Sequence, residues 1–260
     1  MPPPSRAALL AGHQAAVAQV RGRILAFSKV LWAGQPAYRD ADVDRMVKLI
    51  VPRVQAGQLQ VAALTAAYIA RAAGIPPVPV VRAEVLNGRG VPADEVYRRP
   101  AVTVYRSLAG GASYSAAVQA GAARLASTAA TDLQMAKVRQ ARNSMRSGGI
   151  DTYARVVSGK TCALCYVAAT QIYYKEDLSP IHPGCDCGVD PITADRPWDQ
   201  GAMDKQLQDT HAAVDDFLGV SDPGARTPDY RKLVATREHG EFGPTLVRAG
   251  DHFDGPSVVN

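Results

Sequence analysis

The stretch Thr161-Cys-Ala-Leu-Cys-Tyr166, followed by Ile181-His-Pro-Gly-Cys-Asp-Cys-Gly188, contains all four cysteines of the 260-residue chain. The pattern is Cys-x2-Cys, then sixteen residues, then His-x2-Cys-x-Cys. Thiolates from two such segments can surround a tetrahedral Zn2+ ion at about 2.3 Å. The spacing therefore predicts a zinc site with four ligands drawn from five residues, which are Cys162, Cys165, His182, Cys185 and Cys187.

Three ligand sets satisfy this pattern. The first uses all four cysteines, and the other two use three cysteines with His182 and leave out either Cys185 or Cys187. The motif contains neither a carboxylate ligand nor a His-Glu-x-x-His helix, so nothing reserves an open coordination position for water. We therefore expect a structural zinc ion and no enzymatic activity.

Three other interpretations of the cysteines remain open. Two disulfides would require an oxidising compartment, which nothing in the sequence indicates. Inert buried thiols would be scattered along the chain, whereas these fall within 26 positions. A catalytic Cys–His pair needs one activated thiolate beside an orienting base. The two paired-cysteine motifs, which we call knuckles, do not single out one such thiol.

The composition is that of a globular protein, with 47 % apolar residues and enough length for one large or two modest domains. The sequence has no run of eighteen apolar residues, so we expect no membrane contact. Met1-Pro-Pro-Pro-Ser5 and the residues after it lack the apolar core of a signal peptide. These features predict a protein that is made and kept in a cytoplasm.

Charge is divided unequally between the two halves. Residues 1–150 contain 19 Lys and Arg against 7 Asp and Glu, whereas residues 151–260 contain 10 against 17. A basic half suits contact with nucleic acid or with an acidic protein surface. The basic residues that we expect to face DNA or a protein partner are Arg124, Lys137, Arg139, Arg142 and Arg146.

The first 75 residues have the pattern of a helical hairpin or small bundle. Ser5 is a suitable N-cap for a helix to about Trp32, and Asp40 or Asp42 for a second. Pro52 is expected to kink or divide the second helix. A narrow apolar seam along the first helix is a candidate oligomer or partner contact and consists of Leu10, His13, Val17, Val20, Ile24, Phe27 and Leu31.

Five segments follow from the pattern of the whole chain. They are a helical hairpin or bundle (1–75), a Pro-rich linker or arm (76–100), a long Ala-rich helical segment capped by Ser113 (101–149), a Cys/His zinc-knuckle module (150–195) and an acidic C-terminal segment (196–260). The predicted fold class is mainly α with a small zinc-stapled β-hairpin module, an α+β chain. Strands are expected at 153–157, 171–174 and 187–192, and helices near 203–218 and 229–239.

The motif resembles that of the MuF-like minor head proteins of tailed bacteriophages. In that family a Cys-x2-Cys pair precedes a His-Pro-x-Cys-x-Cys segment, as in Cys162–Cys165 and His182–Cys187 here. The segments 153–160 and 236–244 are similar to versions from phages of actinobacteria. The residue between the last two cysteines is often basic in this family and is Asp186 here.

The resemblance implies a minor capsid protein that lies inside the phage head, is associated with the portal and assists head morphogenesis, DNA packaging and ejection. It implies several copies per virion, with the portal, other capsid proteins and double-stranded DNA as partners, and host cytoplasm as the place of assembly. A zinc-dependent nucleic-acid-binding accessory protein is the alternative. It would favour basic knuckles, whereas acidic residues such as Glu176, Asp177 and Asp190 flank them.

Overall fold

The computed structural model describes residues 4–157, 165, 168–169, 172–175, 187–195, 234–239, 243–248 and 250. Its helices are α1 (Arg6–Ala33), α2 (Asp40–Ala73), α3 (Arg82–Leu86), α4 (Ala93–Ala109) and α5 (Tyr114–Ser147). Its strands are β1 (Thr152–Val156), β2 (Ile172–Tyr174), β3 (Gly188–Ile192), β4 (Val234–His239) and β5 (Gly243–Arg248). The prediction of a mainly helical α+β fold is confirmed for these residues.

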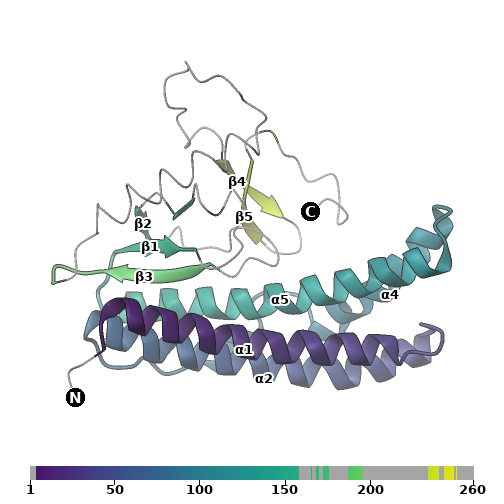
Figure 1. Ribbon diagram of the computed structural model, residues 1–260, viewed down its shortest axis with the longest axis horizontal. Helices are drawn as coiled ribbons and strands as arrows, with labels where there is room; N and C mark the ends of the chain where they lie inside the picture. The colour runs from purple at the N-terminus through teal and green to yellow at the C-terminus, as the bar shows by residue number, and fades with distance from the viewer. Residues whose placement is uncertain are drawn as a thin grey trace.

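Helices α1, α2 and α5 lie side by side as long rods, with α4 beside one end of α5 (Figure 1). Their shared core contains Val20, Ile50, Val61, Leu125 and Leu133, each at most 2 % exposed. None of the described helices meets the length and hydropathy needed to cross a membrane.

The apolar seam of α1 faces this core. His13, Val17, Val20 and Ile24 are all buried, and the last three pack with residues of α2 and α5. The expectation that the seam forms an oligomer or partner contact is therefore wrong. The narrow 3–4 spacing reflects a helix that packs against two neighbours of its own chain.

Helix starts follow the predicted caps in part. The Ser5 and Ser113 hydroxyls accept hydrogen bonds from the backbone N–H of Ala8 and Ala116, as predicted. Helix α2 instead begins after Arg39, which makes no side-chain cap, and Asp40 and Asp42 lie within its first turn. There their charges favourably oppose the positive end of the helix dipole.

Helix α2 is continuous through Pro52, so of the two expected outcomes, a kink or a division, the division does not occur. Proline in a helix interior costs about 3 kcal/mol relative to alanine. Here Ile50 and Val54 are at most 1 % exposed on either side of it, so burial in the bundle offsets that cost.

The Pro-rich segment 76–100 is not a free arm. It contains α3, and α4 begins at Ala93 rather than near Ala101. Val85 of α3 is fully buried with Ala62 of α2 and Ala136 of α5. Pro92 immediately precedes α4, a position where its missing N–H is not needed.

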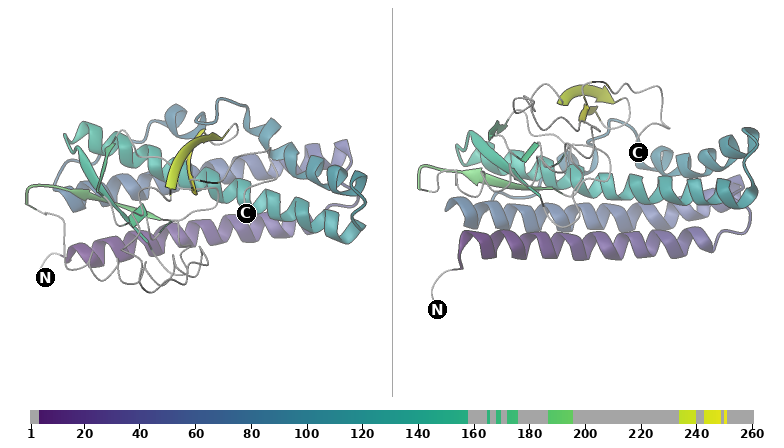
Figure 2. Two further views of the ribbon diagram at one scale, coloured as in Figure 1. Left: turned by 90° about the horizontal axis from the view of Figure 1, so that it is seen from above. Right: turned by 45° about the horizontal axis from the view of Figure 1, so that its top comes forward.

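Strands β1, β2 and β3 form an antiparallel sheet in the order β2-β1-β3, so the three predicted strands are confirmed. The sheet lies over the end of the bundle where α1 begins and α5 ends (Figures 1 and 2). Tyr153 and Val189 share a buried cluster with Tyr68, Ile69 and Met145 of the helices. One buried cluster therefore includes residues from both sides of the segment boundary expected at residue 150.

A charged contact also fixes the sheet to the bundle. Asp190 of β3 accepts hydrogen bonds from Arg6 of α1 and from the Tyr68 hydroxyl of α2, both at 2.8 Å. An acidic residue that flanks the second knuckle therefore has a structural role.

The expected helix near 229–239 is wrong for residues 234–239. These form β4, which pairs antiparallel with β5 from Val234↔Arg248 to His239↔Gly243. The apolar residues behind the helix prediction, Tyr230, Leu233 and Val234, cover barely one turn. The pairing with β5 supplies the backbone hydrogen bonds instead. The expected helix at 203–218 lies outside the described residues.

Candidate metal centre

One cysteine from each predicted pair meets the other in a small buried cluster. Cys165 and Cys187 are 5 % and 2 % exposed, both are free thiols, and they pack with Ala168. Val157 and Tyr173 cover this cluster from its sides. Cys187 immediately precedes β3, so the register of the sheet fixes its position. The structure thus brings together two predicted ligands that are 22 positions apart.

Two N–H groups point at the sulfur of Cys187. Arg155 of β1 donates from Nη1 at 3.7 Å, and Gln134 of α5 donates from Nε2 at 3.6 Å. The same Gln134 amide also donates to the Cys187 carbonyl oxygen at 3.3 Å. Donors of this kind stabilise negative charge on sulfur and orient a metal-bound thiolate.

Arg155 brings a positive charge into this buried site. Its residue exposure is 3 %, and its guanidinium lies 5.0 Å from the ring centre of Tyr173 and 5.9 Å from that of Tyr153. Burying a cation is costly unless an anion lies nearby. If a metal ion binds Cys187, the thiolate would supply such a charge.

Tyr173 closes the cluster on the β2 side. Its hydroxyl donates to the Ala168 carbonyl oxygen at 2.6 Å, which ties β2 to the segment that follows Cys165. Burial raises the pKa of this hydroxyl, the Arg155 charge opposes that shift, and Cys187 and Cys165 add to it. Tyr173 therefore stays neutral and acts as a hydrogen-bond donor.

The described part of the site fits a thiolate-bound metal ion, since it offers two buried thiols and N–H donors to one of them. Cys162, His182 and Cys185 lie outside the described residues. Among the residues that are described, no group of three or more His, Cys, Asp or Glu side chains is placed to bind a metal. The zinc site therefore remains a prediction, with Cys165 and Cys187 as the two ligands whose surroundings are known.

The predicted basic surface on α5 is only partly exposed. Arg146 is exposed, and Arg124 and Arg142 are partly buried, whereas Lys137 is only 3 % exposed. Arg139 donates to the Val85 carbonyl oxygen at 3.1 Å, and its guanidinium leaves no room for a side chain at Gly88. Lys137 and Arg139 therefore do not form the outward-facing surface that we expected.

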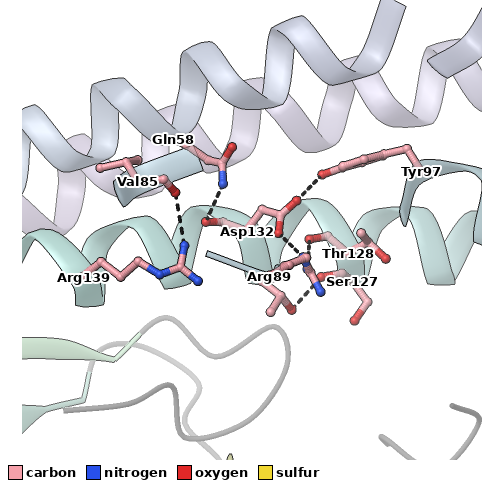
Figure 3. A network of polar contacts seen from close by, with 9 residues as sticks. Gln58, Val85, Arg89, Tyr97, Ser127, Thr128, Asp132 and Arg139 are labelled. Carbon is pink, nitrogen blue, oxygen red and sulfur yellow. Dashed lines mark hydrogen bonds and ion pairs between the residues drawn. The ribbon is translucent and has the colours of Figure 1, made fainter. Parts of the chain in front are cut away.

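A second polar cluster lies in the middle of the bundle (Figure 3). Asp132 of α5 accepts hydrogen bonds from Arg89 at 2.6 Å and from the Tyr97 hydroxyl at 2.8 Å. The Asp132 carbonyl oxygen accepts from Gln58 of α2 at 3.5 Å. Burial, followed by the charge of Asp132, raises the pKa of Tyr97 well above its usual value. This cluster joins the Pro-rich segment and α4 to α5.

His13 is a packed residue of the bundle. Its ring stacks on that of Tyr68 with 4.6 Å between centres, and its Nε2 lies 3.2 Å from the Thr65 hydroxyl. Burial and, to a smaller extent, the charge of Lys137 together lower the pKa of His13 to about 4. The imidazole is neutral at pH 7.

This lowered pKa predicts acid sensitivity. His13 takes up a proton near pH 6.5 in the unfolded chain but only near pH 4 in the folded chain. The free energy of unfolding is therefore unaffected by this group above pH 6.5 and falls as the pH drops from 6.5 to about 4. The loss amounts to about 3 kcal/mol, to which the repulsion between Lys137 and the protonated ring contributes. Urea unfolding of the unaltered protein and of His13→Gln from pH 7 to pH 4 measures it. Equal pH slopes for the two proteins would contradict the assignment.

The fold and the site define a helical bundle that carries a small antiparallel sheet with a buried thiol cluster at its edge. Comparisons with protein-family models, with curated proteins and with solved structures give no match.

Proposed function

We propose that this chain is a structural minor head protein of a tailed bacteriophage, of the MuF-like type. It acts inside the capsid near the portal and assists head assembly and the packaging or ejection of DNA. The motif Cys162–Cys165 with His182–Cys187 supports the family assignment. The observation that carries most weight is the meeting of Cys165 and Cys187 in one buried cluster, with Arg155 and Gln134 donating to sulfur.

In this proposal the zinc ion is structural. Cys165 and Cys187 hold it together with two of Cys162, His182 and Cys185. The two donors at Cys187 favour the sets that include this residue, which are the four cysteines or three cysteines with His182 in place of Cys185. The metal supplies folding free energy to a segment with few apolar residues of its own.

The best test of the proposal is the location of the protein. Quantitative mass spectrometry of particles of the phage that encodes it is expected to find a few to tens of copies per virion, as the resemblance implies. Loss of those copies after DNA release would identify an ejected protein. Absence from purified particles would overturn the head-protein proposal and favour a nucleic-acid-binding accessory protein.

Contact with packaged DNA rests on the charge of the first half, 19 basic against 7 acidic residues. Binding of basic residues to duplex DNA releases the counterions condensed on the phosphates. The free energy gained by this release falls as the salt concentration rises, so electrostatic binding weakens steeply with salt. We expect Arg146→Gln, at an exposed position, to reduce the slope of log affinity against log salt by about one. Fluorescence anisotropy with a random-sequence duplex measures this slope. Binding that does not respond to salt would dismiss the contact.

A further inference from the structure

A small polar cavity, separate from the Asp132 cluster, lies between α1, α5 and the first residue of β3. It is a cavity of about 40 Å³, lined by His13, Gln14 and Arg21 of α1, Lys137 of α5 and Gly188 of β3. One buried water needs roughly 10–15 Å³ of such a cavity volume. The cavity therefore has room for about three waters or one small ion.

The hydrogen bonds of Thr65 determine which nitrogen of His13 carries the proton. The Thr65 hydroxyl donates its only hydrogen to the Val61 carbonyl oxygen at 2.8 Å, so toward His13 it can only accept. His13 Nε2 therefore carries the hydrogen and donates it to Thr65. The other nitrogen, Nδ1, is left as an acceptor, is buried and has no hydrogen-bond partner among the described residues.

The other groups at the cavity are donors. The Gln14 amide nitrogen is also buried without a hydrogen-bond partner in the described part of the chain. Lys137 and Arg21 add two positive charges, and Lys137 is 3 % exposed. Among the described lining residues the polar groups are thus one acceptor, one amide donor and two cations, an arrangement that repels metal ions and favours an anion.

We propose that this cavity binds a small oxyanion that carries its own proton, such as hydrogen phosphate. The negative oxygens would accept hydrogen bonds from Gln14, Lys137 and Arg21, and the hydroxyl of the anion would donate to His13 Nδ1. Sulfate has a similar size and shape but no proton at neutral pH, so it leaves the nitrogen unsatisfied. The cavity is too small for an anion with a large organic group.

The test is isothermal titration calorimetry of the full chain at pH 7 with sodium phosphate, repeated with sodium sulfate at the same ionic strength. Saturable phosphate binding is expected in the millimolar range, and sulfate should bind about tenfold more weakly because one buried acceptor stays unpaired. Lys137→Met should weaken phosphate binding by about tenfold or more, since a charge-assisted hydrogen bond is lost. Arg146→Met, an exposed basic residue on the same helix, is the matched control and should bind phosphate normally.

Gln14→Leu gives a second variant on another helix, and circular dichroism verifies that each variant is folded. The comparison of phosphate with sulfate uses the unaltered protein, so it holds even if both variants fail to fold. Absence of saturable phosphate binding would overturn the proposal, as would equal affinity for the two anions. Full phosphate affinity in a folded Lys137→Met protein would place the ion elsewhere and overturn it too.

Discussion

Replacing Asp132 with alanine is expected to lower the free energy of unfolding by about 3–5 kcal/mol, the usual cost of removing one partner of a buried ion pair. The side chains of Arg89 and Asp132 are only 7 % and 9 % exposed. Without the carboxylate, the Arg89 charge and the Tyr97 hydroxyl would remain buried with no acceptor from Asp132. Urea unfolding followed by far-ultraviolet circular dichroism measures the change.

Two further variants separate the charge from the packing. Tyr97→Phe removes one hydrogen bond to the same carboxylate and should cost about 1–3 kcal/mol. The double variant Arg89→Met with Asp132→Leu removes both charges and should recover much of the loss caused by Asp132→Ala. If Asp132→Ala destabilises the protein no more than Tyr97→Phe does, the ion pair is not the feature that holds this segment.

Replacing Cys187 with serine is expected to remove the zinc ion and to unfold the region around the sheet. In zinc-finger peptides the metal contributes about 10–16 kcal/mol of apparent binding free energy near neutral pH, so a loss of several kcal/mol is expected here. The variant also removes the sulfur that faces the buried Arg155. Metal analysis of the purified protein and limited proteolysis of residues 150–195 measure the two effects.

The core of α1, α2, α4 and α5 contains no residue of the sheet, so these helices should stay protected from protease. Their end near the sheet is the exception, since Tyr153 and Val189 pack there. His211→Ala, outside the Cys/His motif, is the control and should keep the zinc ion. Zinc retained by Cys187→Ser at the level of the unaltered protein would exclude Cys187 as a ligand.

Thiol alkylation tests the structural role of the metal. Protection of the three or four ligand cysteines, lost together on addition of a chelator, is expected for a structural site. A single cysteine that reacts much faster than an ordinary free thiol while the metal is bound would contradict this and revive a catalytic thiol.

Local signals predicted the starts of α1 and α5. Ser5 and Ser113 cap their helices because a hydroxyl acceptor before a helical run satisfies N–H groups whatever the tertiary structure. The strands around Tyr153 and Val189 were predicted because β-branched and aromatic residues cluster there. Packing against partners distant in sequence overrode local preference at Pro52 and in the segment 76–100. At Val234–His239 the pairing with the neighbouring strand β5 decides the conformation.

Of the candidate site, the sequence predicted the cysteines but not the residues that surround them. Spacing identifies Cys165 and Cys187, because metal ligation requires those residue types at short intervals. Nothing in the sequence distinguishes Arg155 from a surface arginine, although its place between Ala154 and Val156 in a predicted strand is a weak signal. Gln134 lies in an Ala-rich helix with several other polar residues, and only the sheet packed against that helix selects it.

The continuity of α5 has a mechanical consequence. Its 34 residues run without a proline from the turn after α4 to the sheet, a length of about 50 Å at 1.5 Å per residue. Tyr105 and Tyr114 are half exposed at the first end, and Gln134, about 30 Å further along the helix, donates a hydrogen bond to Cys187. A stiff helix keeps these two positions at a fixed separation, so a force applied at the tyrosine end reaches the thiol cluster without passing through a hinge.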